Sequence, residues 1–111
     1  MKYSELPEFQ KEFKKYSRKY RTLPTDLNNF KKITNFAPVG TGKHFNVIYS
    51  GETTKIIKAR FFCRCLRGSS MRIVYCFFCE KNQIQFIELY FKGNKENENR
   101  ERIKDYLKKL N

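Results

Sequence analysis

All four cysteines of the chain lie in one stretch, CRCLRGSSMRIVYCFFC, which runs from Cys63 to Cys79. They are spaced as C-x-C and C-x-x-C, and four thiolates about 2.3 Å from one ion are a common structural zinc site. However, YCFFC is typical of a strand, in which Cys76 and Cys79 point to opposite faces about 10 Å apart. A shared zinc ion is therefore not expected, and neither a metal nor another cofactor is predicted.

A disulfide is the second interpretation of these cysteines. If the hairpin turns near Gly68 to Ser70, the residue numbers of two directly opposed positions add up to about 138. Among the cysteines, only Cys63 and Cys76 then come close to opposition. No apolar run is long enough to cross a bilayer and the N-terminal residues lack a signal-peptide core, so we expect a cytoplasmic location. Thiols usually stay reduced there, so we expect the cysteines to act as small core hydrophobes.

The basic residues of the same region could bind phosphate. The chain has 24 Lys and Arg against 11 Asp and Glu, a formal charge of +13, which favours polyanionic partners. Strand periodicity in KIIKARFFCRCLR divides two sets between opposite faces: Lys58, Arg60 and Arg64 with Phe62 on one, and Ala59, Phe61, Cys63 and Cys65 on the other. Arg72 joins the cationic face if the register sum is even. Clustered cations need an anion to offset their repulsion, and phosphate suits Arg and Lys; the alternative is a solvated sheet face.

Two other features carry less chemistry. GTGK at residues 40–43 is not a phosphate-binding loop, because Ala37 and His44 stand where that motif needs Gly and Ser or Thr. His44 is the only histidine, which excludes a two-histidine ribonuclease mechanism. RNA chemistry would have to use Lys, Arg, Tyr or a carboxylate.

The N-terminal third predicts a helical hairpin that would pack on a sheet. Apolar residues at helical spacing follow one face of a first helix: Leu6, Phe9, Phe13, Tyr16 and Tyr20. Pro24 is expected to end this helix and Thr25 to cap a second one, whose buried side would hold Leu27, Phe30 and Ile33. A short strand is expected near Tyr3 to Leu6.

The remainder predicts strands and a last helix. The β-rich runs are Phe45 to Tyr49, Lys55 to Cys65, Met71 to Phe78 and Ile84 to Phe91. The connections SGET, RGSS and EKNQ are short enough for antiparallel hairpins. Helical spacing returns at Ile103, Tyr106, Leu107 and Leu110. We predict one α+β domain over residues 1–111, with an antiparallel sheet of four to five strands, an N-terminal helical hairpin and a C-terminal helix.

Three stretches in this order, KEFKKYSRKYRTLPTDL, SSMRIVY and IELYFKGNKENENRERI, resemble the RelE/ParE superfamily, the small basic toxins of bacterial type II toxin–antitoxin modules. The resemblance spans most of the chain and implies a compact antiparallel sheet with two N-terminal helices and a C-terminal helix. Its RelE-like branch, favoured here, consists of mRNA interferases, endoribonucleases that cleave messenger RNA in the ribosomal A site. The ParE-like branch inhibits DNA gyrase and cuts no RNA. A non-catalytic RNA-binding or ribosome-associated protein is a third interpretation.

The resemblance also implies roles for single residues. Arg72 matches the arginine at the start of the family's G-x-R strand, Lys58 and Arg60 match a K-x-R on the strand before, and Lys92 matches the basic residue after the last strand. These four would be catalytic, with Arg72 and either Arg60 or Arg64 stabilising the phosphorane formed by 2′-hydroxyl attack, and with Lys58 or Lys92 as acid or base. RNA binding is expected from a wider set: Arg64, Arg67, Lys95, Lys11, Lys14, Lys15 and Arg18.

The match to the family is incomplete at three places. Ser70 and Met71 stand where a Gly–aromatic pair is common. KARFFCRCLR is longer than in the shortest members, which leaves the choice among Arg60, Arg64 and Arg67 open. Neither Tyr90 nor Tyr106 aligns convincingly with the C-terminal tyrosine of some members.

The resemblance names the partners too. They are a cognate antitoxin, the ribosome and messenger RNA, with no membrane. The chain would be monomeric when free and hetero-oligomeric with the antitoxin. The antitoxin would cover the basic face or displace the C-terminal helix, whose apolar stripe of Ile103, Tyr106, Leu107 and Leu110 would be the docking surface.

Overall fold

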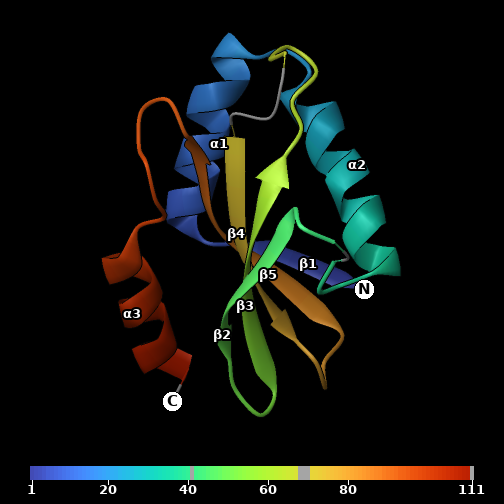
Figure 1. Cartoon of the computed structure of the whole chain (residues 1–111), viewed down its shortest axis with the longest axis vertical. Coiled ribbons are helices and arrows are strands. Elements are labelled where there is room, and N and C mark those ends of the chain that lie inside the picture. Colours follow the sequence, from blue (N-terminus) through green and yellow to red (C-terminus); the bar gives the residue numbers. More distant parts are fainter. Residues whose placement is uncertain (41, 68–70, 111) are drawn as a thin grey trace.

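One mixed five-stranded sheet lies between a pair of helices and a single helix (Figure 1). The computed structural model describes residues 1–40, 42–67 and 71–110. The strands lie in the order β1-β5-β4-β3-β2, and no helix within the described residues is long and apolar enough to cross a membrane. The elements are β1 (Lys2–Glu5), α1 (Pro7–Lys19), α2 (Leu23–Phe36), β2 (Phe45–Ser50), β3 (Thr54–Phe61), β4 (Met71–Phe78), β5 (Gln83–Phe91) and α3 (Arg100–Leu110).

The predicted fold class is confirmed, with one difference in the sheet. Strands β2 to β5 pair antiparallel, as the short connections predict. Strand β1 joins the edge of the sheet parallel to β5, with Tyr3 opposite Ile84. The Tyr3 ring stacks on Phe86 with 5.8 Å between centroids, and its hydroxyl donates to the Lys31 carbonyl at 2.6 Å. Strands β1 and β5 are far apart in the sequence, so no hairpin connects them and none sets the direction of β1. These contacts hold β1 in place instead.

The second helix begins earlier than predicted and buries a different residue near its end. Thr22 occupies the N-cap, and Pro24 lies in the first turn of α2. Backbone N–H groups in the first turn have no acceptor within the helix, so a proline is tolerated there. Helix α1 ends at Lys19 and α2 begins at Leu23, so the expectations that Pro24 ends the first helix and that Thr25 caps the second are wrong. Leu27 and Phe30 are buried as predicted, but Ile33 is 49% exposed and Thr34 is buried in its place.

The register of the β3–β4 hairpin differs from the prediction. Strand β3 ends at Phe61, so the expected strand to Cys65 is too long. Cys76 pairs with Ile56, so the expected opposition of Cys63 and Cys76 is wrong. The proposed turn residues 68–70 lie outside the described residues. The connection between β3 and β4 covers residues 62–70. The residue numbers of paired positions therefore add up to less than the value of about 138 expected for a tight turn at 68–70.

Two apolar clusters fill the two faces of the sheet. The first lies under α1 and α2 and includes Phe9, Phe30, Tyr75 and Cys63. The second lies under α3 and includes Ile56, Val74, Cys76, Ile87, Tyr90 and Tyr106. The cysteines Cys63 and Cys76 thus belong to different clusters. Cys65 is exposed, against the expectation that it faces the core.

Helix α3 is held on its face by polar contacts as well as by its apolar stripe. The Arg102 guanidinium donates to both carboxylate oxygens of Glu12 on α1, at 2.9 and 2.8 Å, and to the Ile87 carbonyl at 2.9 Å. The Tyr106 hydroxyl donates to Gln85 at 2.6 Å. These bonds join the C-terminal helix to both α1 and β5.

Candidate functional site

Three predicted site residues come together on the sheet face that also carries α3. Lys58 and Arg60 alternate with core residues on β3, and Arg72 lies directly opposite Arg60 on β4. Strand pleating places all three on one face, because Val74, which belongs to the cluster under α3, lies opposite Lys58 and two residues from Arg72. The predicted cationic face is confirmed for these three residues.

The three cations border a cavity of about 120 Å³. Its wall also contains Lys43 and His44, which precede β2, and Asn46 of β2 itself. The lining residues are Lys43, His44, Asn46, Lys58, Ala59, Arg60 and Arg72. Every ionisable side chain among them is basic, so the cavity suits a small anion such as a phosphate group.

Arg72 is partly buried beside a second cation. Burial, and after it the positive charge of Arg60, lowers the pKa of Arg72, while Tyr90 acts in the opposite direction. Its Nη1 donates to the Met71 carbonyl at 3.1 Å. A guanidinium stays charged in proteins, so this environment is one that a bound anion would relieve.

Tyr90 continues the same row of the sheet from Arg72 onto β5. The two residues are directly opposite, and Tyr90 is only 3% exposed. Burial raises the pKa of Tyr90 to about 12, helped by Glu98 and Glu88 and opposed by Arg72. The phenol is therefore neutral at physiological pH and can donate a hydrogen bond.

Two carboxylates face the cations from β5 and the following loop. Lys58 Nζ donates to Glu98 at 2.9 Å. Burial alone would raise the pKa of Glu98, but the hydrogen bond and charge of Lys58, with a smaller contribution from Arg100, lower it overall. Glu98 is thus a stable carboxylate that holds the Lys58 ammonium beside the cavity.

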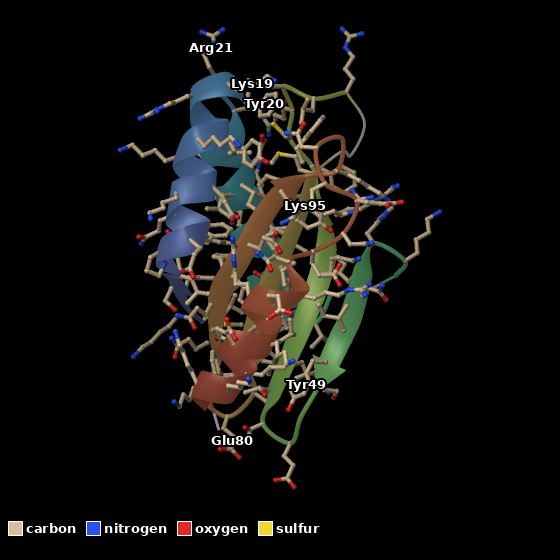
Figure 2. The ribbon with its side chains drawn as sticks, turned by 90° about the vertical axis from the view of Figure 1, so that its left-hand side faces the viewer. Lys19, Tyr20, Arg21, Tyr49, Glu80 and Lys95 are labelled. Carbon is tan, nitrogen blue, oxygen red and sulfur yellow. The ribbon has the colours of Figure 1, made fainter. Side chains whose placement is uncertain are left out.

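Glu88 forms the second carboxylate pair, with Lys95. Glu88 is fully buried; it accepts from Lys95 Nζ and, at 2.8 Å, from the Asn99 backbone N–H. Lys95 Nζ also lies 5.2 Å from the centre of the Tyr90 ring. Figure 2 shows Lys95 toward the upper part of the sheet, above helix α3 in that view.

The remaining predicted site residues lie elsewhere. Lys92 is exposed in the turn that follows β5, whereas Lys95 reaches Tyr90. The expectation that Arg64 shares the face of Lys58 is wrong, because β3 has ended and Arg64 lies 3.8 Å from Asp26 on α2. Arg67 is exposed in the connection to β4. The predicted RNA-binding residues of α1 are all exposed: Lys11, Lys14, Lys15 and Arg18.

Sequence reasoning missed two residues that the fold brings to the site. As the only histidine, His44 has no partner in the sequence that predicts a role, yet it lines the cavity, and its carbonyl accepts from the Arg60 backbone N–H at 3.0 Å. Glu98 lies in a charged run, KENENRER, where no spacing distinguishes it from its neighbours. Only the return of this loop across the sheet identifies Glu98 as the partner of Lys58.

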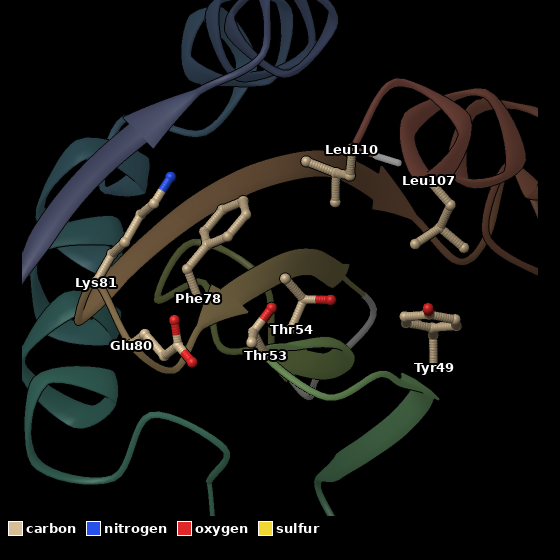
Figure 3. Close-up of a pocket in the computed structure, with 8 residues that line it drawn as sticks. All are labelled: Tyr49, Thr53, Thr54, Phe78, Glu80, Lys81, Leu107 and Leu110. Carbon is tan, nitrogen blue, oxygen red and sulfur yellow. The ribbon is translucent and has the colours of Figure 1, made fainter.

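A second cavity, of about 210 Å³, lies under the end of α3 and contains none of the predicted catalytic residues (Figure 3). Leu107 and Leu110 of the predicted antitoxin-docking stripe border it, and Figure 3 shows Leu107 facing the ring of Tyr49. Ile103, Tyr106 and Leu107 of the stripe pack on the chain's own sheet, whereas Leu110 is 40% exposed. The lining residues are Tyr49, Thr53, Thr54, Phe78, Glu80, Lys81, Leu107 and Leu110.

Comparisons with known proteins give a match at the level of structure. No protein-family model matches the chain, and no curated protein matches its sequence. A chain of the crystal structure of the archaeal RelE-RelB complex from Pyrococcus horikoshii OT3 superimposes with a TM-score of 0.63, over 83% of this chain and 94% of that chain, at 14% identity. The protein therefore has the RelE-like fold that the sequence resemblance predicts.

Proposed function

We propose that the protein is the toxin of a type II toxin–antitoxin module and acts as a ribosome-dependent endoribonuclease on messenger RNA. The observation that supports this most directly is the row Arg60–Arg72–Tyr90 on one sheet face, with Lys58 beside it. A fold shared with a chain of a RelE–RelB complex agrees with the proposal. The cluster also offers what phosphate chemistry needs: fixed cations in a partly desolvated site.

The proposed reaction is an internal transesterification. The 2′-hydroxyl oxygen of one nucleotide attacks its own 3′-phosphorus, the bond to the 5′-oxygen of the next nucleotide breaks, and a 2′,3′-cyclic phosphate and a 5′-hydroxyl end are formed. Arg60 and Arg72 stabilise the negative charge that accumulates on the phosphorane. Tyr90, held neutral by its raised pKa, donates a hydrogen bond to a phosphate oxygen.

Proton transfer is assigned to Lys58 or Lys92. Lys58 borders the cavity, and substrate phosphate would compete with Glu98 for its ammonium group. Lys92 extends from the exposed turn after β5, on the strand end that carries Tyr90. One of them takes the 2′-hydroxyl proton or supplies a proton to the departing 5′-oxygen.

The wider basic surface would bind RNA without reading its sequence. Lys11, Lys14, Lys15 and Arg18 are exposed on α1 and are suited to phosphate contacts with ribosomal RNA. The protein partner would be an antitoxin. Since Ile103, Tyr106 and Leu107 of the α3 stripe pack on the sheet, an antitoxin that used these three residues would have to displace α3.

The test is induced expression of the wild type and Arg72→Ala, with 5′ ends of translated messages mapped in both. The wild type is expected to arrest growth and to produce new 5′-hydroxyl ends within coding regions, and the variant is expected to produce neither. Growth arrest with intact messages would contradict the nuclease proposal and favour a protein target such as gyrase. RNA binding that falls steeply with salt, without cleavage, would favour a non-catalytic RNA-binding protein.

A further inference from the structure

The C-x-C cysteines follow the end of β3 and lie beside the start of α2, and neither lines the cationic cavity. Thr22, the N-cap residue of α2, places its hydroxyl oxygen 3.4 Å from the sulfur of Cys65 and 3.7 Å from the sulfur of Cys63. The two sulfurs therefore lie close to the same oxygen atom. Neither the anion site nor the RNA-binding surface uses them.

The turn that carries these cysteines is firmly attached to α2. The Leu66 N–H donates to the Cys63 carbonyl at 2.9 Å, and the Cys65 N–H donates to the Thr22 hydroxyl oxygen at 3.2 Å. The Arg64 N–H donates to the Asp26 carboxylate at 3.1 Å. The single proton of the Thr22 hydroxyl has two acceptors within reach, the Asp26 carboxylate at 2.8 Å and the Cys65 sulfur at 3.4 Å. These bonds hold both sulfurs near Thr22.

The two thiols differ in their environment. Cys65 is exposed, and hydrogen bonding by Thr22, opposed by burial and by Asp26, lowers its pKa. Cys63 is 3% exposed in the core cluster, and its burial raises its pKa. An accessible thiol with a lowered pKa next to a second, protected thiol is the arrangement typical of reversible thiol oxidation.

We propose that Cys63 and Cys65 form a redox-sensitive dithiol, in which Cys65 reacts first with a peroxide and Cys63 resolves the product as a disulfide. The Cys65 thiolate attacks one peroxide oxygen, the O–O bond breaks, and a sulfenic acid and hydroxide are formed. The Cys63 sulfur then attacks the Cys65 sulfur, the S–O bond breaks, and the hydroxide leaves with the Cys63 proton as water. The two thiols are oxidised by two electrons, and the peroxide is reduced to two molecules of water.

The disulfide would be easy to reduce again. A bridge between residues i and i+2 closes a small ring, and a strained bridge has a high reduction potential. Its formation would also draw Cys63 away from the core cluster and Cys65 away from Thr22. Dithiothreitol is therefore expected to restore the reduced chain fully.

The experiment exposes the reduced, full-length protein to hydrogen peroxide, blocks the remaining thiols with iodoacetamide and digests with trypsin. Cleavage after Arg60, Arg64 and Arg67 separates the two cysteines, so a bridge is seen as FFCR joined to CLR. We expect this joined product before any oxidation at Cys79, the other exposed cysteine, and its loss after dithiothreitol. Oxidation of Cys79 at the same rate as Cys65, or no joined product, would overturn the proposal.

Matched variants separate the two roles. Cys63→Ser is expected to stop the reaction at a sulfenic acid on Cys65, which dimedone traps, and Cys65→Ser is expected to leave Cys63 as a thiol. Cys79→Ser should leave the bridge unchanged. Thr22→Val, which removes the hydroxyl but keeps the shape, should slow alkylation of Cys65 several-fold, while Thr22→Ser should not. Equal alkylation rates in these two Thr22 variants would contradict activation by the hydroxyl.

Discussion

Arg60 and Arg72 lie directly opposite each other across the antiparallel pair β3–β4, although like charges in that position repel. Burial and the neighbouring Arg60 both lower the pKa of Arg72. Such a pair is stabilised when an anion binds between the two groups. This relationship underlies the first two predictions.

Sulfate or inorganic phosphate is expected to stabilise the wild type more than the Arg60→Ala or Arg72→Ala variant. An anion at 100 times its dissociation constant stabilises the folded state by about 2.7 kcal/mol, and each kcal/mol raises the melting temperature of a domain of this size by about 4 °C. Arg64→Ala is the matched control, because Arg64 lies near Asp26. The measurement is thermal unfolding at constant ionic strength; equal shifts in all four proteins would contradict an anion site at this pair.

Arg72→Ala is expected to reduce RNA cleavage by about two orders of magnitude, because one cation that stabilises the transition state is worth roughly 3 kcal/mol. Arg64→Ala and Arg67→Ala are expected to cost less than tenfold, since both lie away from the cavity. The measurement is the single-turnover rate on programmed ribosomes. A loss at Arg67 equal to that at Arg72 would move the catalytic site into the β3–β4 connection.

Lys95→Ala is expected to lower stability, whereas Lys92→Ala is expected to lower activity and leave stability unchanged. Lys95→Ala removes a partner of the fully buried Glu88, so unfolding should become easier by about 2 kcal/mol. Lys92→Ala removes an exposed side chain and should leave stability within about 0.5 kcal/mol. If Lys92 transfers a proton, its variant loses cleavage activity while it remains stable. Chemical denaturation and cleavage rates, measured on both variants, separate the two effects.

Glu98→Gln is expected to destabilise the fold by about 1 kcal/mol at neutral pH, through its bond to Lys58. Since the pKa of Glu98 is lowered in the folded state, its contribution is present above the unfolded value of about 4.3 and is lost as the pH falls through the folded pKa. The difference in unfolding free energy between wild type and Glu98→Gln should therefore shrink in acid. Urea titrations at neutral and acidic pH measure it; a gap that widens in acid would contradict the ion pair.

Arg102→Ala is expected to destabilise the attachment of α3 by about 2 kcal/mol, since the guanidinium bonds Glu12 through two atoms and also bonds the Ile87 carbonyl. Lys104→Ala, an exposed change on the same helix, is the control and should stay within about 0.5 kcal/mol. Hydrogen exchange of the α3 amides reports the effect locally. Unchanged protection in Arg102→Ala would show that the apolar stripe alone holds the helix.

The sequence by itself determined the elements and the main cationic residues. Helical spacing of Phe9, Phe13 and Tyr16 predicts α1, and strand alternation around Lys58 and Arg60 predicts their shared face, because side-chain direction follows directly from local geometry. The short connections after β2 and β4 predict antiparallel hairpins, because a connection of a few residues can join only antiparallel neighbours.

Only the tertiary structure decided the register and the partners. The pairing of Arg60 with Arg72, and of Cys76 with Ile56, depends on where β3 ends, and the C-x-C stretch continues the strand pattern beyond that point. The placement of Glu98 beside Lys58 depends on a loop that returns from β5 across the sheet. Both are contacts between residues far apart in the chain, and local periodicity contains no information about which distant segments pack together.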